Sequence, residues 1–409
     1  MITKITLENF FSFGSDTTIE LNSGVNILIG INGSGKSNLL KAIKLLFEGI
    51  AGEGFKKTFL EDWGGFSSVA NFSSETNFIK LSFEFDANKV NEITSNKGYI
   101  FEGNPIYEIK IHPIGNTNYF LSEKLFSPNI NQKHVDFKYM DMSNGKGWIS
   151  TRDNNNKPKL IHYPSRDAGI SFGENELVLR QISDPDRYYP HFTLKKAIES
   201  IAVYDYFDTT LKSKIRQPRD WNIETKLVSN GENLTIILQQ LKNKYALDYE
   251  KIEKSIKDIN PYFKDIGFDF FANKIFLVLR EKKLSKSVSI SHISDGTLRF
   301  LILLAIFFNP ERGKMILLDE PETGLHPDMI SSLSEWMKNS AKNSQVIIAT
   351  HAPLLLNNFD LEDLLIFEKD DNNQTIVETK NEEDFEEWVD KNFSVGQLWL
   401  KGLLGGKRW

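Results

Sequence analysis

The sequence contains no cysteine among its 409 residues, which excludes disulfide bonds and zinc sites built on thiolates. This absence fits a reducing compartment, and the chain starts without a signal peptide, so we expect a cytoplasmic protein. Long apolar runs are also missing. The longest uncharged one, residues 300–308, has nine residues, whereas a membrane-spanning helix needs about 20. We therefore expect no membrane partner.

The chain also lacks a strong charge of either sign, since its net charge is −6. Residues 357–393 contain 13 acidic residues and three lysines, a net charge of −10, so the rest of the chain carries +4. That remainder is too weakly positive for a strongly basic nucleic-acid binder. For the acidic stretch itself we expect a solvated surface.

The hydrophobic pattern changes along the chain. Strands alternate with helices at both ends, which is typical of a parallel sheet, whereas residues 78–163 alternate apolar and polar side chains as β-strands do. Residues 190–265 follow a helical period, and Pro261 ends the last helix there. One predicted helical stripe consists of Leu194, Ala197, Ile198, Ile201 and Ala202, and another of Leu234, Ile237, Leu238 and Leu241.

These patterns predict four regions within an α/β protein. Residues 1–75 form an N-terminal lobe and residues 76–170 a β-rich subdomain. Residues 171–290 form a helical insertion with connecting strands, and residues 291–409 a C-terminal lobe with a tail. The length of the chain allows two or three compact units with cores of their own.

A glycine-rich loop, "GINGSGKS" at residues 30–37, lies between a predicted buried strand and a predicted helix. It matches the G-x-x-x-x-G-K-[ST] pattern, and its context is that of a P-loop, or Walker A motif. Backbone N–H groups and the helix N-terminus bind phosphate, Lys36 reaches the β- and γ-phosphates, and Ser37 offers a hydroxyl to Mg²⁺. The candidate ATP-binding residues here are Gly30, Asn32, Gly33, Ser34, Gly35, Lys36, Ser37 and Asn38.

Two further apolar strands end in polar residues. Residues 315–318 deliver Asp319, which is suited to hold Mg²⁺, and Glu320, which could polarise an attacking water. The strand in "SQVIIATHAP" ends at Thr350 and His351. A histidine after a strand is often a capping residue, but beside the other motifs His351 is a candidate sensor of the γ-phosphate.

The stretch "SDGT" at residues 294–297 precedes a strongly apolar helix. The Ser294 hydroxyl, the N–H groups around Gly296 and the positive end of that helix form a second anion-binding surface. Because one phosphate site is already complete, we expect Ser294 and Gly296 of one subunit to close over ATP held by Lys36 of another, in a twofold dimer. The alternative is that Ser294 or Asp295 only caps the helix.

Together these motifs resemble those of ABC-type ATPase heads of the SMC and RecF group. The resemblance is closest to the head of OLD-family nucleases and to standalone AAA-family ATPases of two-gene anti-phage systems such as PARIS and Septu. It rests on "GINGSGKSNLLKAI", "NGENLTIILQQL", "ISDGTLRFLILL", "LLDEPETGLHP" and "IIATHAPLLL". It covers both ends of the chain well and the middle thinly. The resemblance implies an ABC-type P-loop head with two lobes, a mixed or parallel core sheet and flanking helices.

The resemblance also implies roles for single residues. Ser294 to Thr297 would be the signature motif, Asp319 the Mg²⁺ ligand, Glu320 the catalytic base and His351 the switch histidine. The segment "ETGLHP" would cross a dimer interface. The family often has a basic residue where this chain has Phe11, whose ring could stack on adenine or simply pack. Gln181 is a weak candidate for the Q-loop.

Two features of related proteins are missing from this chain, and their absence indicates a partner. There is no coiled coil between the P-loop and the signature, and the 58 residues after His351 are too few for a Toprim nuclease domain. We therefore expect an effector acting in trans, of Toprim, HNH or RNase type, controlled by an ATP-hydrolysing homodimer or higher oligomer in phage defence. The alternatives are a RecF-like clamp that grips DNA during repair and an ATP-bound scaffold that sequesters a partner.

Two weaker features leave alternatives open. Six basic residues could form a DNA-binding face or merely lie on solvated helices: Lys195, Lys196, Lys212, Lys214, Arg216 and Arg219. The apolar tail at residues 395–409 could dock a partner or pack on its own lobe.

Overall fold

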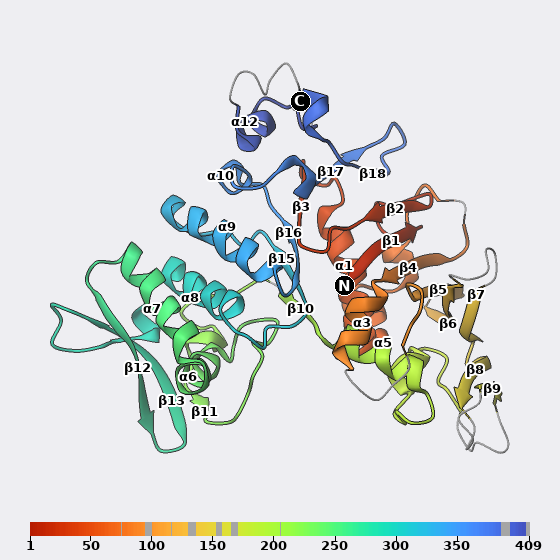
Figure 1. Ribbon diagram of the computed structural model, residues 1–409, viewed down its shortest axis with the longest axis horizontal. Coiled ribbons are helices and arrows are strands. Elements are labelled where there is room, and N and C mark those ends of the chain that lie inside the picture. Colours follow the sequence, from red (N-terminus) through yellow and green to blue (C-terminus); the bar gives the residue numbers. More distant parts are fainter. Residues whose placement is uncertain are drawn as a thin grey trace. The chain divides into compact units, whose positions relative to one another are not determined.

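The computed structural model describes residues 1–74, 76–94, 100–115, 117–129, 136–152, 158–164, 171–204, 206–385 and 393–405 (Figure 1). The chain forms two compact units. The first consists of residues 1–23, 30–201 and 365–378, and the second of residues 24–29, 202–364 and 379–409. Each unit is thus assembled from segments that are far apart in the sequence. The four regions expected from the sequence stay a prediction.

The first unit is built on an eight-stranded antiparallel sheet with the order β2-β1-β4-β5-β6-β7-β8-β9. Its strands alternate buried and half-exposed side chains, as predicted. In β4 (Ile79–Phe85) the apolar side chains of Ile79, Leu81, Phe83 and Phe85 are fully buried, and the residues between them are not. This alternation places one face of the strand on the core and confirms the pattern read from the sequence.

The other elements of the first unit flank this sheet. Helix α5 packs on α1, α3 and α4, and β17 and β18 form an antiparallel hairpin in which β18 contacts β2. The elements of this unit are β1 (Ile2–Glu8), β2 (Thr17–Glu20), α1 (Lys36–Ile50), the π-helix η1 (Lys57–Asp62), α2 (Phe66–Val69), α3 (Ala87–Ile93), β5 (Ile106–Ile114), β6 (Asn118–Pro128), β7 (Asp136–Ser143), β8 (Lys146–Arg152), β9 (Pro158–Tyr163), α4 (Val178–Gln181), α5 (Tyr189–Glu199), β17 (Leu364–Lys369) and β18 (Thr375–Glu378).

The second unit contains the strands β10-β15-β16-β3 in that order. β15 (Met315–Asp319) and β16 (Gln345–Ala349) run parallel, with Asp319 opposite Ala349, and β16 runs parallel to β3 (Val25–Gly30). All six residues of β3 and all five of β16 are buried, because side chains cover both faces of a parallel sheet. The carboxyl ends of β3, β15 and β16 therefore lie at one edge of this sheet.

Helices and a small second sheet complete the second unit. The small sheet has the order β11-β13-β12, with β14 also paired to β13. The remaining elements are β10 (Ile201–Tyr204), the 3₁₀-helix η2 (Lys214–Arg216), β11 (Arg219–Asp220), α6 (Leu234–Lys244), α7 (Ala246–Ile259), β12 (Phe263–Phe271), β13 (Lys274–Glu281), β14 (Val288–Ser289), η3 (Ile290–His292), α8 (Asp295–Phe307), α9 (Pro327–Ala341), α10 (Pro353–Leu356), η4 (Leu361–Asp363), η5 (Glu382–Phe385) and α12 (Val395–Leu400).

One helical stripe expected from the sequence is wrong at its end. Helix α5 stops at Glu199, and Ile201 and Ala202 belong to strand β10. A four-residue apolar run cannot be assigned to a strand or a helix from its period alone. The second stripe is confirmed, because Leu234, Ile237, Leu238 and Leu241 are all buried in α6; Pro261 does follow α7, which ends at Ile259.

The described part of the C-terminal tail packs on its own unit. Helix α12 contacts α10, and the Gly396 N–H donates to Asn357 Oδ1 at 2.9 Å. Leu398, Trp399 and Leu404 are buried. Of the two readings of the tail, the structure supports packing on the same chain for residues 395–405, and the last four residues lie outside the described ones.

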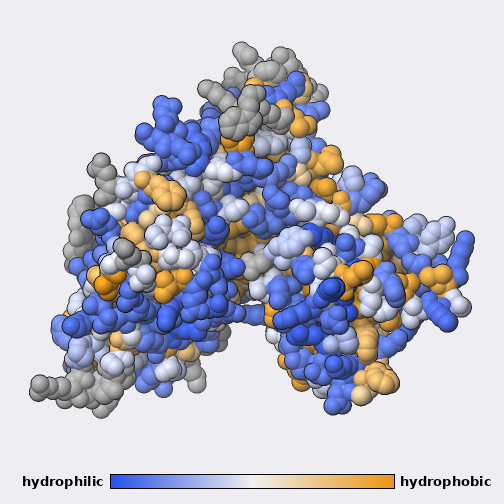
Figure 2. Space-filling model, turned by 180° about the vertical axis from the view of Figure 1, so that it is seen from behind, coloured by the Kyte–Doolittle hydropathy of each residue, from blue (hydrophilic) through white to orange (hydrophobic). Residues whose placement is uncertain are grey.

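The surface is mostly hydrophilic on the face drawn in Figure 2, where apolar residues occur in several separate groups. Among the described residues, no helix is long and apolar enough to cross a membrane. The α/β prediction is confirmed by this arrangement of sheets and helices.

Candidate nucleotide-binding site

The P-loop follows β3 directly and needs its glycines. Gly30, Gly33 and Gly35 have φ angles of 152°, 80° and 113°, a backbone region that other residues rarely adopt. A Cβ at Gly35 would overlap Thr375 Oγ1, so that position is closed to larger residues. The Gly33 and Gly35 N–H groups donate to no other group among the described residues. The loop therefore has backbone donors to offer an anion, and phosphate binding by these residues stays a prediction.

Lys36 is the first residue of α1 and is 5% exposed. Its Nζ donates to the carbonyl oxygens of Gly30 at 2.8 Å and Ile31 at 3.1 Å. These two hydrogen bonds hold the ammonium group against the start of the loop. From there it would reach the oxygens of a phosphate bound in the loop. No acidic side chain lies in the first turn of α1, so the positive end of this 15-residue helix is not neutralised locally.

These features fit ATP phosphates. The Ser34 hydroxyl is buried and has no hydrogen-bond partner among the described residues. Ser37 is exposed in the first turn of α1, where its hydroxyl is available to a cation, whereas the Asn38 side chain donates to Ser12 Oγ at 2.7 Å. No group of three or more His, Asp or Glu side chains in the described ranges is placed to hold a metal ion. A Mg²⁺ ion here would take most of its ligands from phosphate oxygens and water, which is its usual preference.

In the second unit, Asp319 ends β15 and Glu320 follows with a φ of 47°. The Glu320 N–H donates to the Ala349 carbonyl at 2.8 Å, and its Oε1 lies 3.4 Å from His351 Nε2. The side chains of Glu320 and His351 are 48% and 33% exposed. The structure thus brings the predicted base and the predicted switch histidine together, and both side chains remain partly exposed.

The signature stretch does form a helix cap. Ser294 Oγ accepts from the Thr297 N–H at 3.2 Å at the start of α8. The capping reading is therefore correct, and it leaves the anion-binding reading open, because the first turn of α8 still presents backbone donors. A Cβ at Gly296 would come within 2.9 Å of the Gly324 carbonyl, so the signature lies against the "ETGLHP" loop of its own chain.

Comparison with known families decides the kind of protein. A family described as "AAA domain" matches residues 4–286, more than two thirds of the chain. The chain belongs to this AAA domain family. A second family, described as "AAA domain, putative AbiEii toxin, Type IV TA system", matches residues 223–357.

Curated relatives of this AAA domain chain confirm the predicted link to the RecF and SMC group of ABC-type ATPases. The chain is 23% identical over 400 residues to the retron Ec83 probable ATPase of Escherichia coli, covering 89% of this chain and 70% of that protein. It is 40% identical over 83 residues to the DNA replication and repair protein RecF of Thermoanaerobacter sp., covering 19% and 23%. It is 33% identical over 96 residues to the structural maintenance of chromosomes protein 3 homolog of Plasmodium falciparum, covering 24% and 8%. The chain thus matches only a minor part of the RecF and SMC relatives.

Solved structures confirm the predicted head fold. An SMC head bound to the C-winged helix domain of ScpA has a TM-score of 0.56 at 15% identity, covering 93% of this chain and 98% of that one. An SMC head domain with an extended coiled coil, bound to the C-terminal domain of ScpA from Pyrococcus furiosus, has a TM-score of 0.54 at 13% identity, covering 95% and 98%. At these identities the likeness concerns the fold alone.

In this AAA domain chain, Phe11 is half-buried and has a φ of 50°. Its ring meets Trp63 edge-on, with the centroids 5.7 Å apart, and Lys41 Nζ lies 4.4 Å from the ring centroid. Lys41 is one turn along α1 from the P-loop. The ring is therefore packed and also lies beside α1, so adenine stacking by Phe11 stays a prediction.

Glu322 is a residue whose importance the sequence did not reveal. Its Oε1 accepts from the Thr350 hydroxyl at 2.5 Å and from the His351 N–H at 3.2 Å. Burial raises the pKa of the Glu322 carboxyl above its usual value, and the hydrogen bond from Thr350 opposes that shift. Glu322 thereby joins the loop after β15 to the loop after β16, which carry Glu320 and His351.

The predicted basic face is wrong for Arg216. This residue is 3% exposed and donates to the carbonyl oxygens of Thr209, Ile290 and Ile293, and to Asp295 Oδ1. It supports the signature loop from inside the unit. Lys214 and Arg219 both pair with Glu232. Lys195 donates to two backbone carbonyls, so only part of the basic set is available to DNA.

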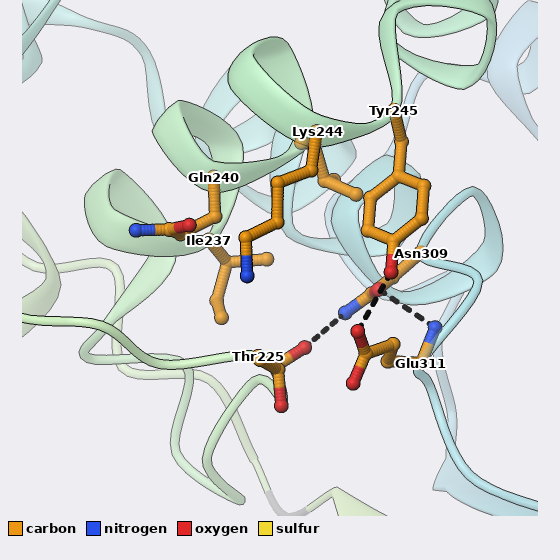
Figure 3. Close-up of a pocket in the computed structure, with 8 residues that line it drawn as sticks. Thr225, Ile237, Gln240, Lys244, Tyr245, Asn309 and Glu311 are labelled. Atoms are coloured by element: carbon orange, nitrogen blue, oxygen red, sulfur yellow. Dashed lines mark hydrogen bonds between the residues drawn. The ribbon is translucent and has the colours of Figure 1, made fainter.

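Gln181 and a small pocket beside α6 complete the description, and the assignment of Gln181 to the Q-loop stays a prediction. The Gln181 amide donates to the Glu176 carbonyl at 3.0 Å, and its oxygen accepts from the Gly173 N–H at 2.9 Å, so it orders its own loop. A pocket beside α6 is lined by Lys244, Tyr245, Asn309 and Glu311 among others, and Tyr245 donates to Glu311 there at 2.7 Å (Figure 3). This pocket has room for about one water molecule and is too small for a nucleotide.

Proposed function

We propose that this chain is a Mg²⁺-dependent ATPase whose working site is completed by a second copy of the chain. Lys36 and the P-loop bind the phosphates, Ser37 and Asp319 hold Mg²⁺, and Glu320 activates the attacking water. His351 orients Glu320 and senses the γ-phosphate. Ser294 and Gly296 of the second copy close over the nucleotide.

The observation that carries this proposal is the placement of the motifs on parallel strands. β3, β15 and β16 end at the same edge, and the P-loop, the Asp319–Glu320 pair and His351 each follow one of these ends. In open α/β sheets, ligands bind beyond the carboxyl ends of the strands. The 3.4 Å approach of His351 to Glu320 supports the assignment of base and switch.

The proposal of a second copy rests on the signature stretch. α8 is a 13-residue helix whose N-terminus presents donors, and its own chain covers Gly296 with the loop that contains Gly324. In a site formed by two copies, the N-terminus of α8 and the loop that contains Gly324 would both approach the same nucleotide. Isologous pairing would then form two such sites at once.

The biological role is part of the same proposal. One of the relatives is the probable ATPase of a retron, aligned over most of both chains, and a matched family carries a toxin–antitoxin description. We assign to this chain the control of a separately encoded effector, with ATP-driven dimer closure as the switch, in defence against phage.

The test compares the wild type with K36A, E320Q, a Ser294 variant and a control variant in ATP binding, ATP turnover and mass by light scattering. K36A loses ATP binding, and E320Q binds ATP but hydrolyses it about 100-fold or more slowly, since a general base contributes that much. ATP should also shift E320Q to a dimer. The matched control is E335Q, on the exposed face of α9, which behaves as wild type. Full-speed turnover by E320Q, or by a strict monomer in which Ser294 is altered, refutes the proposal.

A second candidate is a DNA clamp, favoured by the RecF match of 40% identity over 83 residues. Direct binding to DNA requires an affinity that falls steeply with salt, with a slope set by the number of phosphate contacts. Measuring the DNA dissociation constant between 50 and 200 mM salt, with and without ATP, separates the two functions. An effector ATPase shows little DNA binding of its own.

A further inference from the structure

Four polar groups meet behind the P-loop. They come from the loop between β1 and β2 (Ser12), from the P-loop and α1 (Ser34 and Asn38), and from β18 (Thr375). Thr375 is 1% exposed, and its Oγ1 lies 2.7 Å from Ser12 Oγ and 2.7 Å from the Ser34 carbonyl oxygen. Asn38 Nδ2 lies 2.7 Å from Ser12 Oγ. The Thr375 N–H also donates to the Ser12 carbonyl at 2.7 Å.

The direction of each hydrogen bond follows from the groups themselves. The Ser34 carbonyl can only accept, so the single proton of the Thr375 hydroxyl goes to it. The Ser12 hydroxyl must then donate to Thr375 Oγ1, and the Asn38 amide, which has protons to give, donates to Ser12 Oγ. The result is an ordered chain from Asn38 through Ser12 and Thr375 to the Ser34 carbonyl, in which each bond polarises the next. We call it the hydroxyl chain.

The hydroxyl chain holds the P-loop at its middle and at the start of α1. Ser34 lies in the middle of the loop, and Asn38 lies in the first turn of α1, two residues beyond Lys36. Between them, Gly35 lies so close to Thr375 and Ser12 that a Cβ there would overlap both hydroxyls. Because the Ser34 carbonyl is fixed toward Thr375, the N–H group of Gly35, in the same peptide unit, is fixed on the opposite side.

We infer that Thr375 is a positioning residue for the phosphate-binding loop. It contacts no phosphate itself. It keeps the Gly35 peptide turned so that its N–H faces the bound anion, and it carries this constraint from a hairpin about 340 residues away in the sequence. The inference rests on the proposed function only in naming the anion as the phosphates of ATP.

The decisive variants are T375V and T375S. Valine keeps the branched shape but puts a methyl group where a hydroxyl now lies 2.7 Å from two oxygens, and C···O contacts need about 3.3 Å. The Ser34 carbonyl also loses its buried donor. Serine keeps the hydroxyl group and therefore preserves the hydroxyl chain. The matched control is T151V, because Thr151 is 3% exposed and donates to the Lys159 carbonyl at 3.0 Å in β8, about 24 Å along the sheet from β1.

Two measurements test the inference. The first is the Kd for MgATP, with inorganic pyrophosphate as competitor. T375V should raise the dissociation constants of MgATP and of pyrophosphate by about 10-fold, since one unsatisfied buried carbonyl costs of that order. For T375S and T151V both constants should stay within about twofold of wild type. The equal loss for pyrophosphate shows that the phosphate cradle, and not base recognition, has changed.

The second measurement is hydrogen exchange of amides in residues 30–40 without nucleotide. Exchange should accelerate in T375V and not in T375S or T151V. Exchange and pyrophosphate binding like those of wild type in T375V would overturn the inference. If wild-type protein fails to bind ATP, the proposed function is refuted, while the exchange comparison still decides whether Thr375 holds the loop.

Discussion

Replacing Arg216 with alanine should loosen the signature loop more than any surface change in this unit. The guanidinium group is buried and makes four hydrogen bonds of 2.6–2.8 Å: one from Nε to the Thr209 carbonyl, two from Nη1 to the Ile290 and Ile293 carbonyls, and one from Nη2 to Asp295 Oδ1. Two of its acceptors, the Ile293 carbonyl and Asp295 Oδ1, lie on either side of Ser294, where the signature starts. R216A therefore leaves three backbone carbonyls without their donor and opens a cavity beneath residues 290–295.

The size of the effect can be worked from these contacts. Breaking a buried, hydrogen-bonded charge usually costs about 3–5 kcal/mol. The Asp295 side chain is 66% exposed, so the ion pair with it supplies less than about 1 kcal/mol of that total. Most of the loss comes from the carbonyls. D295N should accordingly be mild, and R216A severe.

Urea unfolding gives the change in stability of the second unit, and hydrogen exchange of residues 289–297 gives the local change. The control is R219A, three residues away, whose guanidinium lies 3.4 Å from Glu232 and is 29% exposed; it should cost under about 1 kcal/mol. ATP turnover should fall in R216A under conditions in which the protein is still folded. If R216A matches R219A in both stability and exchange, the supporting role of Arg216 is wrong.

Two further changes test two carboxylates, the half-buried Glu322 and the buried Glu123. E322A should lower the kcat of ATP turnover with little change in nucleotide Kd, because it separates the loops that carry Glu320 and His351. E322Q should retain most of the activity, because its amide oxygen still accepts from Thr350. Equal losses of activity in both variants would contradict this role of Glu322. Burial raises the pKa of Glu123 to about 7 from 4.5. The unfolded chain loses this proton first, so Glu123 lowers stability progressively as pH rises from about 4.5 to 7. The difference in unfolding free energy between E123Q and wild type should grow over that window, and a constant difference would refute the assignment.

The features that could be predicted from the sequence have causes that lie close to them along the chain. The P-loop is specified by its glycines and by the strand and helix on either side of it, and the Ser294 cap lies three residues from its donor. The alternation in β4 depends only on which face of the strand is buried. In each case the physical cause lies within a few residues, so a pattern in the sequence reports it.

The residues that sequence reasoning missed have distant partners. Arg216 reads as one of several surface cations, yet its acceptors lie up to 79 residues away. Thr375 lies in an acidic stretch expected to be a solvated surface, and it is almost fully buried against Ser34, 341 residues away. Glu322 looks like part of an interface loop and is a half-buried acceptor for Thr350. Burial of a polar side chain depends on tertiary contacts, and a single sequence carries no local signal for it.

Arg216, Glu322 and Thr375 share one feature that explains why the motifs can be both rigid and reactive. Each contacts backbone atoms of the loop that it supports: the carbonyls of Ile290 and Ile293, the N–H of His351 and the carbonyl of Ser34. A loop supported through its own motif side chains would lose those side chains for catalysis. Support through the backbone fixes the peptide planes without using the motif groups that the proposed function assigns to the nucleotide, namely Ser294, His351 and the P-loop N–H groups. The same logic predicts that conservative changes which keep the hydrogen bond, such as T375S and E322Q, preserve function where changes in shape alone do not.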